Sequence, residues 1–445
     1  MERFAKNAKI KDAPTLTGPS PALMAAIRHG LAWLVIGNAI GVMIAILLLL
    51  PRLNSWLGEW TYGRWMMVHM NTALFGWCSL PMVALLFRAF RAEDAPLGSW
   101  CRPVVWLWSA GLLVGSVSWL RGQSSGKLFL DWSGYARVLF PLSLFALWLL
   151  LAAAFLRSRD NMSARIAKGA GLLVLLGVPF AIYFASDPGI YAAVNPASGG
   201  PTGASQLEST LGVVLILLAL PFAMARRTKS SVRVLVAAWI VFLLETFLCV
   251  ALGRGNASHH SLAQYLGLTS VLVWLILVPL YYRAFRWSAA SGRWRTAFLW
   301  WWGGIVFTGW AVFLPGVLDR VKFTDVLVGH SLAAVAGFLS AFILFVIAEL
   351  VGDRHAWIVN RAWSFYAWNI GVLAYVLVMF ITGWIEGADP AFTIVPGFAR
   401  NVLYTVRLFT GVAMLAGSVE WLVASASIIG AHMPAEIESQ EMEVA

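Results

Sequence analysis

The sequence predicts an all-α integral membrane protein with about twelve transmembrane helices. The first observation is compositional: of 445 residues, 60% are hydrophobic and only 12% are charged, and the mean hydropathy is +0.77. A soluble globular chain would carry about 25% charged residues. The second observation is that the apolar residues come in continuous runs of about twenty, the length that a helix needs to cross a bilayer. A membrane barrel would instead show short alternating segments.

Twelve apolar runs account for most of the chain, and we expect one continuous domain over residues 31–430. A basic arm, 1–30, precedes this domain and an acidic tail, 431–445, follows it. The predicted spans lie near 31–51, 65–87, 103–119, 137–156, 169–186, 208–225, 232–252, 263–281, 297–315, 326–350, 364–385 and 402–430.

The basic residues are distributed unevenly between the two sides of the predicted membrane domain. Most of the 32 Lys and Arg residues lie in the N-terminal arm and in every second loop. Because short cytoplasmic loops carry the excess of Lys and Arg, both termini are predicted to be cytoplasmic. The net charge of +11 therefore reflects membrane topology and does not indicate a nucleic-acid partner.

Two of the seven histidines, His69 and His330, lie within predicted spans. A histidine in the hydrocarbon region needs a partner, and a neutral imidazole is a good ligand for haem iron or copper. The alternative for each is a hydrogen bond to a neighbouring helix.

Ionisable residues inside the spans are candidates for proton transfer or ion coupling. Glu245 is the deepest carboxylate; a hydrogen bond to a neighbouring helix is the alternative role. Asp325 and Glu386 are expected to cap helix ends. Arg407 lies within an apolar run and needs an anionic partner, either a haem propionate or one of these carboxylates.

Four stretches carry a resemblance to a known family. They are PRLNSWLGEWTYGRWMMVHMNTALFGW (51–77), FTDVLVGH (323–330), MFITGWIEGADPAF (379–392) and LYTVRLFTGVAMLAGS (403–418). With one histidine in the second of twelve helices and another in the tenth, the chain resembles subunit I of the haem–copper oxidase superfamily, most of all its cbb3-type branch. The resemblance implies twelve helices around two haem sites, with haem of the b type, in the plasma (inner) membrane of a bacterium.

The family's tenth helix carries His-x-His, whereas this chain has His330-Ser331-Leu332. By resemblance, His330 corresponds to the proximal ligand of the high-spin haem. Leu332 then replaces one axial ligand of the low-spin haem, whose other ligand corresponds to His69. Residues two positions apart on a helix are rotated by about 200°, so the two positions face different haems.

The copper ligands of the family are not recognisable. Glu208 stands about where the first copper histidine belongs, and the family's histidine pair falls at Leu252-Gly253. His259 and His260 come later, in a predicted outer loop. Copper without three nitrogen ligands would be weakly held, so copper is doubtful and no metal ligands are predicted.

We therefore expect a noncanonical or accessory subunit of a respiratory electron-transfer complex, with one or two haems held by His69, His330 and Arg407. The implied partners are other membrane subunits, membrane lipid and a cytochrome c-type electron donor on the outer side. Glu245 is the candidate for proton movement.

Three alternatives stay open. In an unconventional O2 or NO reductase, Glu208 and Glu245 would be the catalytic residues and would hold a metal such as non-haem iron, which accepts carboxylates. A haem-free structural subunit or proton- or ion-conducting protein would account for the missing ligands together with the intramembrane carboxylates. A sensor that binds a gas at one five-coordinate haem is the third.

Overall fold

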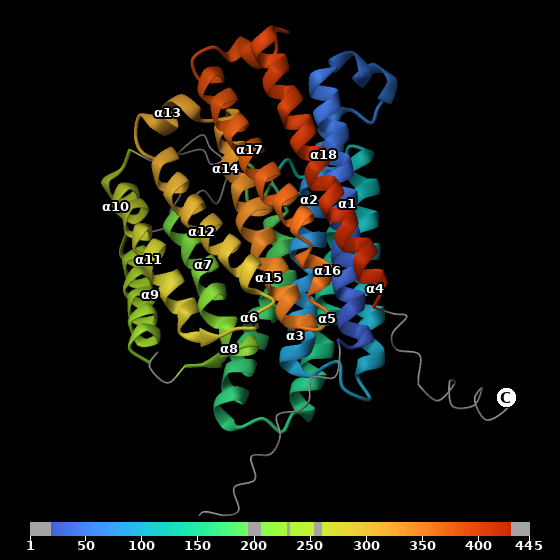
Figure 1. Cartoon of the computed structure of the whole chain (residues 1–445), viewed down its shortest axis with the longest axis vertical. Coiled ribbons are helices and arrows are strands. Elements are labelled where there is room, and N and C mark those ends of the chain that lie inside the picture. The colour runs from blue at the N-terminus through green and yellow to red at the C-terminus, as the bar shows by residue number, and fades with distance from the viewer. Residues whose placement is uncertain (1–18, 128, 195–205, 229–231, 253–259, 429–445) are drawn as a thin grey trace, which may run out of the picture.

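The computed structural model describes residues 19–127, 129–194, 206–228, 232–252 and 260–428. Long helices run side by side and form one bundle (Figure 1). Two short strands, β1 and β2, pair antiparallel and join two basic loops at one end of the bundle. In chain order the elements are α1 (Pro21–Leu49), η1 (Pro51–Leu57), α2 (Tyr62–Asn71), η2 (Thr72–Cys78), α3 (Leu80–Phe90), α4 (Gly98–Leu120), α5 (Ala136–Arg157), α6 (Met162–Ala185), α7 (Gln206–Ala219), α8 (Pro221–Met224), β1 (Arg226–Arg227), α9 (Val232–Leu252), α10 (Leu262–Ser270), η4 (Val271–Val273), α11 (Trp274–Arg283), β2 (Phe285–Arg286), α12 (Gly292–Val312), α13 (Val317–Val321), α14 (Asp325–Leu332), η5 (Ala333–Leu339), α15 (Ser340–Val351), α16 (Trp357–Asn360), α17 (Ala362–Glu386), η6 (Pro390–Thr393) and α18 (Phe398–Ala426).

The all-α membrane fold predicted from the sequence is confirmed. Within the described ranges, eleven helices are long and apolar enough to cross a membrane. The predicted span at 297–315 corresponds to α12, which is not one of the eleven although its 21 residues reach about 31 Å. Tryptophans and glycines fill its middle (299–304, LWWWGG), and both residue types contribute little to hydropathy.

The first helix begins earlier than the apolar run predicts. Its first residue is Pro21 instead of residue 31, because Ser20 caps the helix and accepts a hydrogen bond from the Leu23 amide at 3.2 Å. Serine at the cap followed by proline is a favourable helix start. Residues 1–18 of the arm and 429–445, which include the predicted tail, lie outside the described residues.

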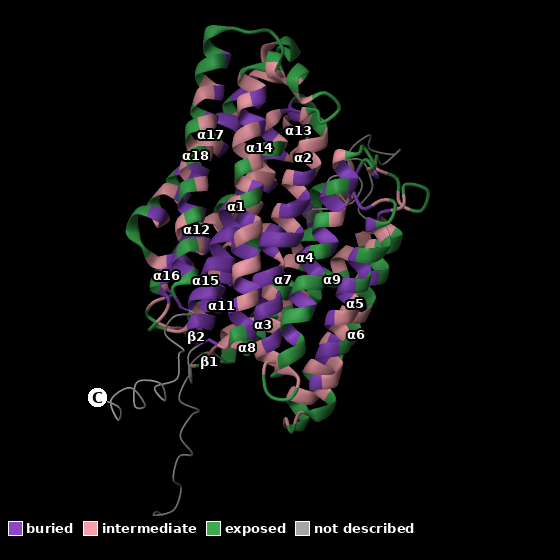
Figure 2. Ribbon diagram, turned by 90° about the vertical axis from the view of Figure 1, so that its right-hand side faces the viewer, coloured by how far each residue is buried: buried purple, intermediate pink, exposed green. Residues whose placement is uncertain are grey.

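Burial separates a central helix from peripheral ones (Figure 2). Nearly every residue of α15 is buried, so this helix contacts protein on all sides. By contrast, α6 buries only Leu172 and Pro179, although its composition is strongly apolar. A helix that is apolar all round and largely exposed faces lipid, as expected at the edge of a membrane bundle.

Two of the spans contain a π-helical segment. In the span Tyr62–Phe90 it is η2, and in the span Asp325–Val351 it is η5. Segments of this kind are rare and occur frequently at functional sites. Both follow directly after the helical turn that carries an intramembrane histidine.

Candidate functional site

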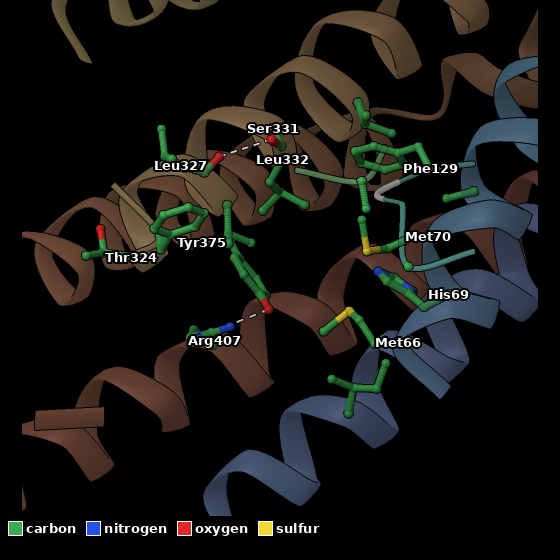
Figure 3. Close-up of a pocket in the computed structure, with 18 of the residues that line it drawn as sticks. Met66, His69, Met70, Phe129, Thr324, Leu327, Ser331, Leu332, Tyr375 and Arg407 are labelled. Atoms are coloured by element: carbon green, nitrogen blue, oxygen red, sulfur yellow. Dashed lines mark hydrogen bonds between the residues drawn. The ribbon is translucent and has the colours of Figure 1, made fainter. Parts of the chain in front are cut away.

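A cavity of about 560 Å³ lies among α1, α2, α14, α17 and α18 (Figure 3). Its lining is mostly apolar with a few polar groups, which is typical of cofactor and small-molecule sites. His69 lines it from α2, Leu332 from α14, Tyr375 from α17 and Arg407 from α18. The structure therefore brings together two of the three predicted cofactor-binding residues, His69 and Arg407.

The imidazole of His69 is fixed by two contacts with α1. Its Nδ1 lies 2.7 Å from the carbonyl oxygen of Gly37, and because a carbonyl can only accept, Nδ1 carries the proton. The ring lies against Gly41, where an added Cβ would stand 2.8 Å from Cε1. Among the described residues Nε2 has no hydrogen-bond partner. A histidine that donates one ring N–H to a carbonyl and keeps the other nitrogen free has the arrangement of a metal ligand.

The α14 side of the cavity carries no residue equivalent to His69. Leu332 lies there, and a leucine side chain has no donor atom. Figure 3 shows Met66 and Met70 next to His69, on the same helix. Their sulfur atoms therefore approach the cavity from the His69 side.

Arg407 is 7% exposed and forms an ion pair inside the protein. Its Nη1 lies 2.8 Å from Oδ2 of Asp325, its Nε donates to the Tyr375 hydroxyl at 3.4 Å, and its guanidinium lies 5.0 Å from the Tyr404 ring centroid. Glu386 accepts a hydrogen bond from the Asp325 amide at 2.9 Å. Glu386, at the end of α17, thus accepts from a backbone amide at the amino end of α14. The N-cap of α14 is Thr324, whereas the Asp325 side chain pairs with Arg407.

His330 does not line this cavity. Its ring faces α12, where Nδ1 lies 3.1 Å from Oγ1 of Thr308. The Thr308 hydroxyl donates to the carbonyl of Gly304 at 2.7 Å, so it accepts from Nδ1 of His330. The ring lies against Gly309, where an added Cβ would stand 3.2 Å from Cε1.

The two histidine sites are built in the same way. In each span the π-helical segment begins three residues after the histidine, at Thr72 after His69 and at Ala333 after His330. A tryptophan of the next long helix, Trp108 or Trp368, donates to a carbonyl within that segment, at 2.7 Å and 2.9 Å respectively. Both histidines therefore lie in the same kind of local structure, a π-helical segment held by a tryptophan of the next long helix.

This arrangement around each histidine has a signal in the sequence. The pattern H-x6-G-x2-S occurs at 69–79 and again at 330–340. Its glycines, Gly76 and Gly337, lie against Trp33 and Trp301, where an added Cβ would approach either tryptophan side chain to 2.5 Å. The spacing W-x7-G then leads from each tryptophan to the glycine under the histidine ring, at 33–41 and 301–309. A search for internal repeats would have found these ring-supporting glycines.

Glu245, the predicted proton-transfer residue, is 6% exposed and lies on α9. Its Oε2 accepts a hydrogen bond from Nε1 of Trp274 at 2.6 Å, and Trp274 is fully buried. Trp302 in turn donates to the Trp274 carbonyl at 2.8 Å. The carboxyl group thus belongs to a hydrogen-bonded contact between α9, α11 and α12, separate from the His69 cavity.

The candidates for a second metal are dispersed. Glu208 is exposed in the first turn of α7. His260 is exposed, and its Nε2 lies 3.0 Å from Oδ1 of Asp319. His259 lies outside the described residues. Within the part of the chain that the structure describes, no group of three or more His, Cys, Asp or Glu side chains is placed to hold a metal ion.

Two known proteins are similar to this chain over most of its length. Cytochrome c oxidase subunit 1 of Rhodobacter capsulatus is 22% identical over 444 residues, which cover 87% of this chain and 81% of that protein. A cytochrome c oxidase subunit 1 homolog of Azorhizobium caulinodans is 21% identical over 455 residues, with 91% and 82% coverage. No protein-family model matches the chain. The chain is therefore an all-α integral membrane protein that is similar to cytochrome c oxidase subunit 1.

Proposed function

We propose that this chain binds one haem, of the b type, in the cavity between α2 and α14, where His69 would hold its iron. The observation that carries the proposal is the setting of His69: Nδ1 bonded to Gly37, the ring supported by Gly41, and Nε2 unpaired at a mostly apolar cavity of about 560 Å³. A haem bound there would supply one-electron redox chemistry.

The rest of the cavity fits such a group. Arg407 lines the cavity and is held in place by Asp325 and by two tyrosines. Its guanidinium would also bind a haem propionate. Tyr375 and Leu332 supply flat and apolar surface. Burying the macrocycle among these side chains excludes water from it.

The residues do not fit a copper centre beside this haem. Glu208 and His260 are both exposed, and the described residues contain no cluster of three ligands. We therefore propose a noncanonical or accessory role in a respiratory complex and not the reduction of O2 at a haem–copper pair. The similarity to cytochrome c oxidase subunit 1 supports the respiratory context.

In this role the chain would sit with both termini in the cytoplasm of a bacterium, in the inner membrane. The cavity would then open toward the outer loops, since Gly126, Phe129 and Ala193 line it. A cytochrome c-type donor on the outer side would deliver electrons there, and other membrane subunits would cover the lipid-exposed helices.

Glu245 is our proposal for proton movement, supported by its buried carboxyl group on a membrane helix. The conservative variant Glu245→Gln keeps an acceptor for the Trp274 indole but cannot carry a proton. In the intact complex, reconstituted in vesicles, we expect this variant to retain haem and fold and to lose proton uptake. Unchanged proton uptake would contradict the role and leave Glu245 as a packing residue.

The haem proposal is tested by haem quantification on the purified full-length protein. We expect one haem per chain in the wild type and in His330→Ala, and loss of the haem in His69→Ala. Each variant removes a histidine side chain, and the two histidines lie in similar local structures in different spans, so each variant is the control for the other. Haem that is lost only in His330→Ala would overturn the assignment, and a wild-type protein without haem would favour the haem-free scaffold.

A further inference from the structure

The α14 wall of the cavity offers no second ligand for a haem held by His69. This wall consists of Leu327, Val328, Ser331 and Leu332 on α14 and Val335 in η5. The only polar side chain among them is Ser331, whose hydroxyl donates to the Leu327 carbonyl at 3.0 Å. An alcohol with its proton already committed is a poor ligand for iron, which prefers imidazole and soft sulfur donors.

The other polar lining residues stand on other elements and are held by their own partners, or lie on the His69 side. The Tyr375 hydroxyl accepts from Arg407, and the Thr324 hydroxyl donates to the Val321 carbonyl at 2.8 Å. Met66 and Met70 share α2 with His69 and approach from the same side. Two axial ligands must stand on opposite faces of the macrocycle, so neither sulfur completes the pair.

We propose that the Leu332 side of the cavity is a binding site for one uncharged diatomic gas, such as carbon monoxide or nitric oxide. The proposal rests on the haem assigned to His69, which would keep its sixth position free. The described lining residues of α14 and η5 have no uncommitted hydrogen-bond donor, so a charged ligand at this wall would lose its hydration without replacement. Distal pockets that are apolar and lack donors favour neutral ligands over polar ones.

The loop end of the cavity gives such a ligand a way in. Phe129 and Phe323 line the cavity there, and both have a positive φ, 60° and 65°. A bulky residue in this conformation is strained and is held by its surroundings, a condition that clusters at ligand clamps. Phe323 is 65% exposed and Val194 is 54% exposed, so the rim reaches the surface.

The test is a carbon monoxide difference spectrum of the dithionite-reduced full-length protein. We expect the wild type to show the spectrum of a five-coordinate ferrous haem, whose absorption bands shift when carbon monoxide is added. Leu332→His would place an imidazole opposite His69, so we expect a six-coordinate low-spin spectrum and loss of the carbon monoxide shift. The matched control, Leu332→Ala, supplies no ligand and keeps the shift.

The outcomes separate the gas site from the haem assignment. A wild-type haem that is already six-coordinate and does not respond to carbon monoxide would overturn the gas site and leave the haem in place. A Leu332→His protein that still binds carbon monoxide would also overturn it. Absence of haem would overturn both proposals. If Leu332→His does not fold, the wild-type spectrum alone decides.

Discussion

The indole Nε1 of Trp77 donates a hydrogen bond to the hydroxyl oxygen of Ser340, 2.8 Å away, and so joins the two histidine-bearing spans. Trp77 lies in the first π-helical segment and Ser340 directly after the second. The Ser340 hydroxyl itself donates to the Val335 carbonyl at 2.8 Å. The two local frameworks that hold His69 and His330 are therefore linked to each other in the buried core.

Removing this link is expected to destabilise the bundle. Trp77→Phe keeps the aromatic ring but leaves the buried Ser340 oxygen without its donor, which costs about 1–3 kcal/mol. Thermal unfolding of the detergent-solubilised protein measures the loss. Trp300→Phe is the control, because Trp300 is 78% exposed and its replacement should change stability little. Equal effects of the two substitutions would contradict the structural role of the link.

A methyl group at Gly41 is expected to displace the His69 ring. The added Cβ would stand 2.8 Å from Cε1, and the hydrogen bond to Gly37 prevents the ring from turning away easily. We expect Gly41→Ala to weaken haem binding by about 10- to 100-fold, the usual effect of disturbing the groups that orient a ligand. Haem titration measures it. Gly303→Ala, with open space around its added Cβ, should bind haem like the wild type.

The ion pair between Arg407 and Asp325 is expected to matter for stability. Their side chains are 8% and 19% exposed, and in the haem-free protein Asp325→Asn would leave the buried guanidinium without its counter-charge. Breaking a buried pair in this way costs about 3–5 kcal/mol. Glu59→Gln, at the exposed pair of Glu59 with Arg64, should cost at most about 1 kcal/mol. Similar unfolding temperatures for both variants would contradict the account.

The loop between α4 and α5 is expected to give the protein a pH-dependent stability. Asp131 is 5% exposed; burial raises its pKa, and hydrogen bonds from Ser124 and Asn71 oppose the rise only in part. The native state therefore binds the proton more tightly than the unfolded chain. The free energy of unfolding should fall as the pH rises from about 3.9 to the raised pKa, and then level off.

Asp131→Asn should remove this component of the pH profile, which unfolding at a series of pH values measures. Asp187→Asn is a control in which the effect on the pH profile has the opposite sign. A hydrogen bond from the Gly189 amide, and to a smaller extent the nearby Arg137, lowers the pKa of Asp187. Asp187 therefore contributes stability that is lost as the pH falls through its lowered pKa, and its replacement changes the profile with the other sign. An Asp131→Asn profile identical to that of the wild type would contradict the assignment.

The sequence predicts the membrane bundle well because apolar runs of about twenty residues mark the segments that can cross a bilayer. It predicts the site less completely. Hydropathy carries no information on the π-helical segments, or on the close contacts of Gly76 and Gly337 with tryptophans of neighbouring helices. The sequence limits the partner of Arg407 to a haem propionate or one of the intramembrane carboxylates. That Asp325 is the partner depends on how α14 packs against α17, which in turn packs against α18.

The central claim is that His69 holds the haem, and chemical rescue tests it most directly. In His69→Gly the ligand is removed and its space is left open, so the purified protein should lose haem and recover it when imidazole is added together with haem. His330→Gly should keep its haem without imidazole. A His69→Gly protein that retains full haem in the absence of imidazole would contradict the account.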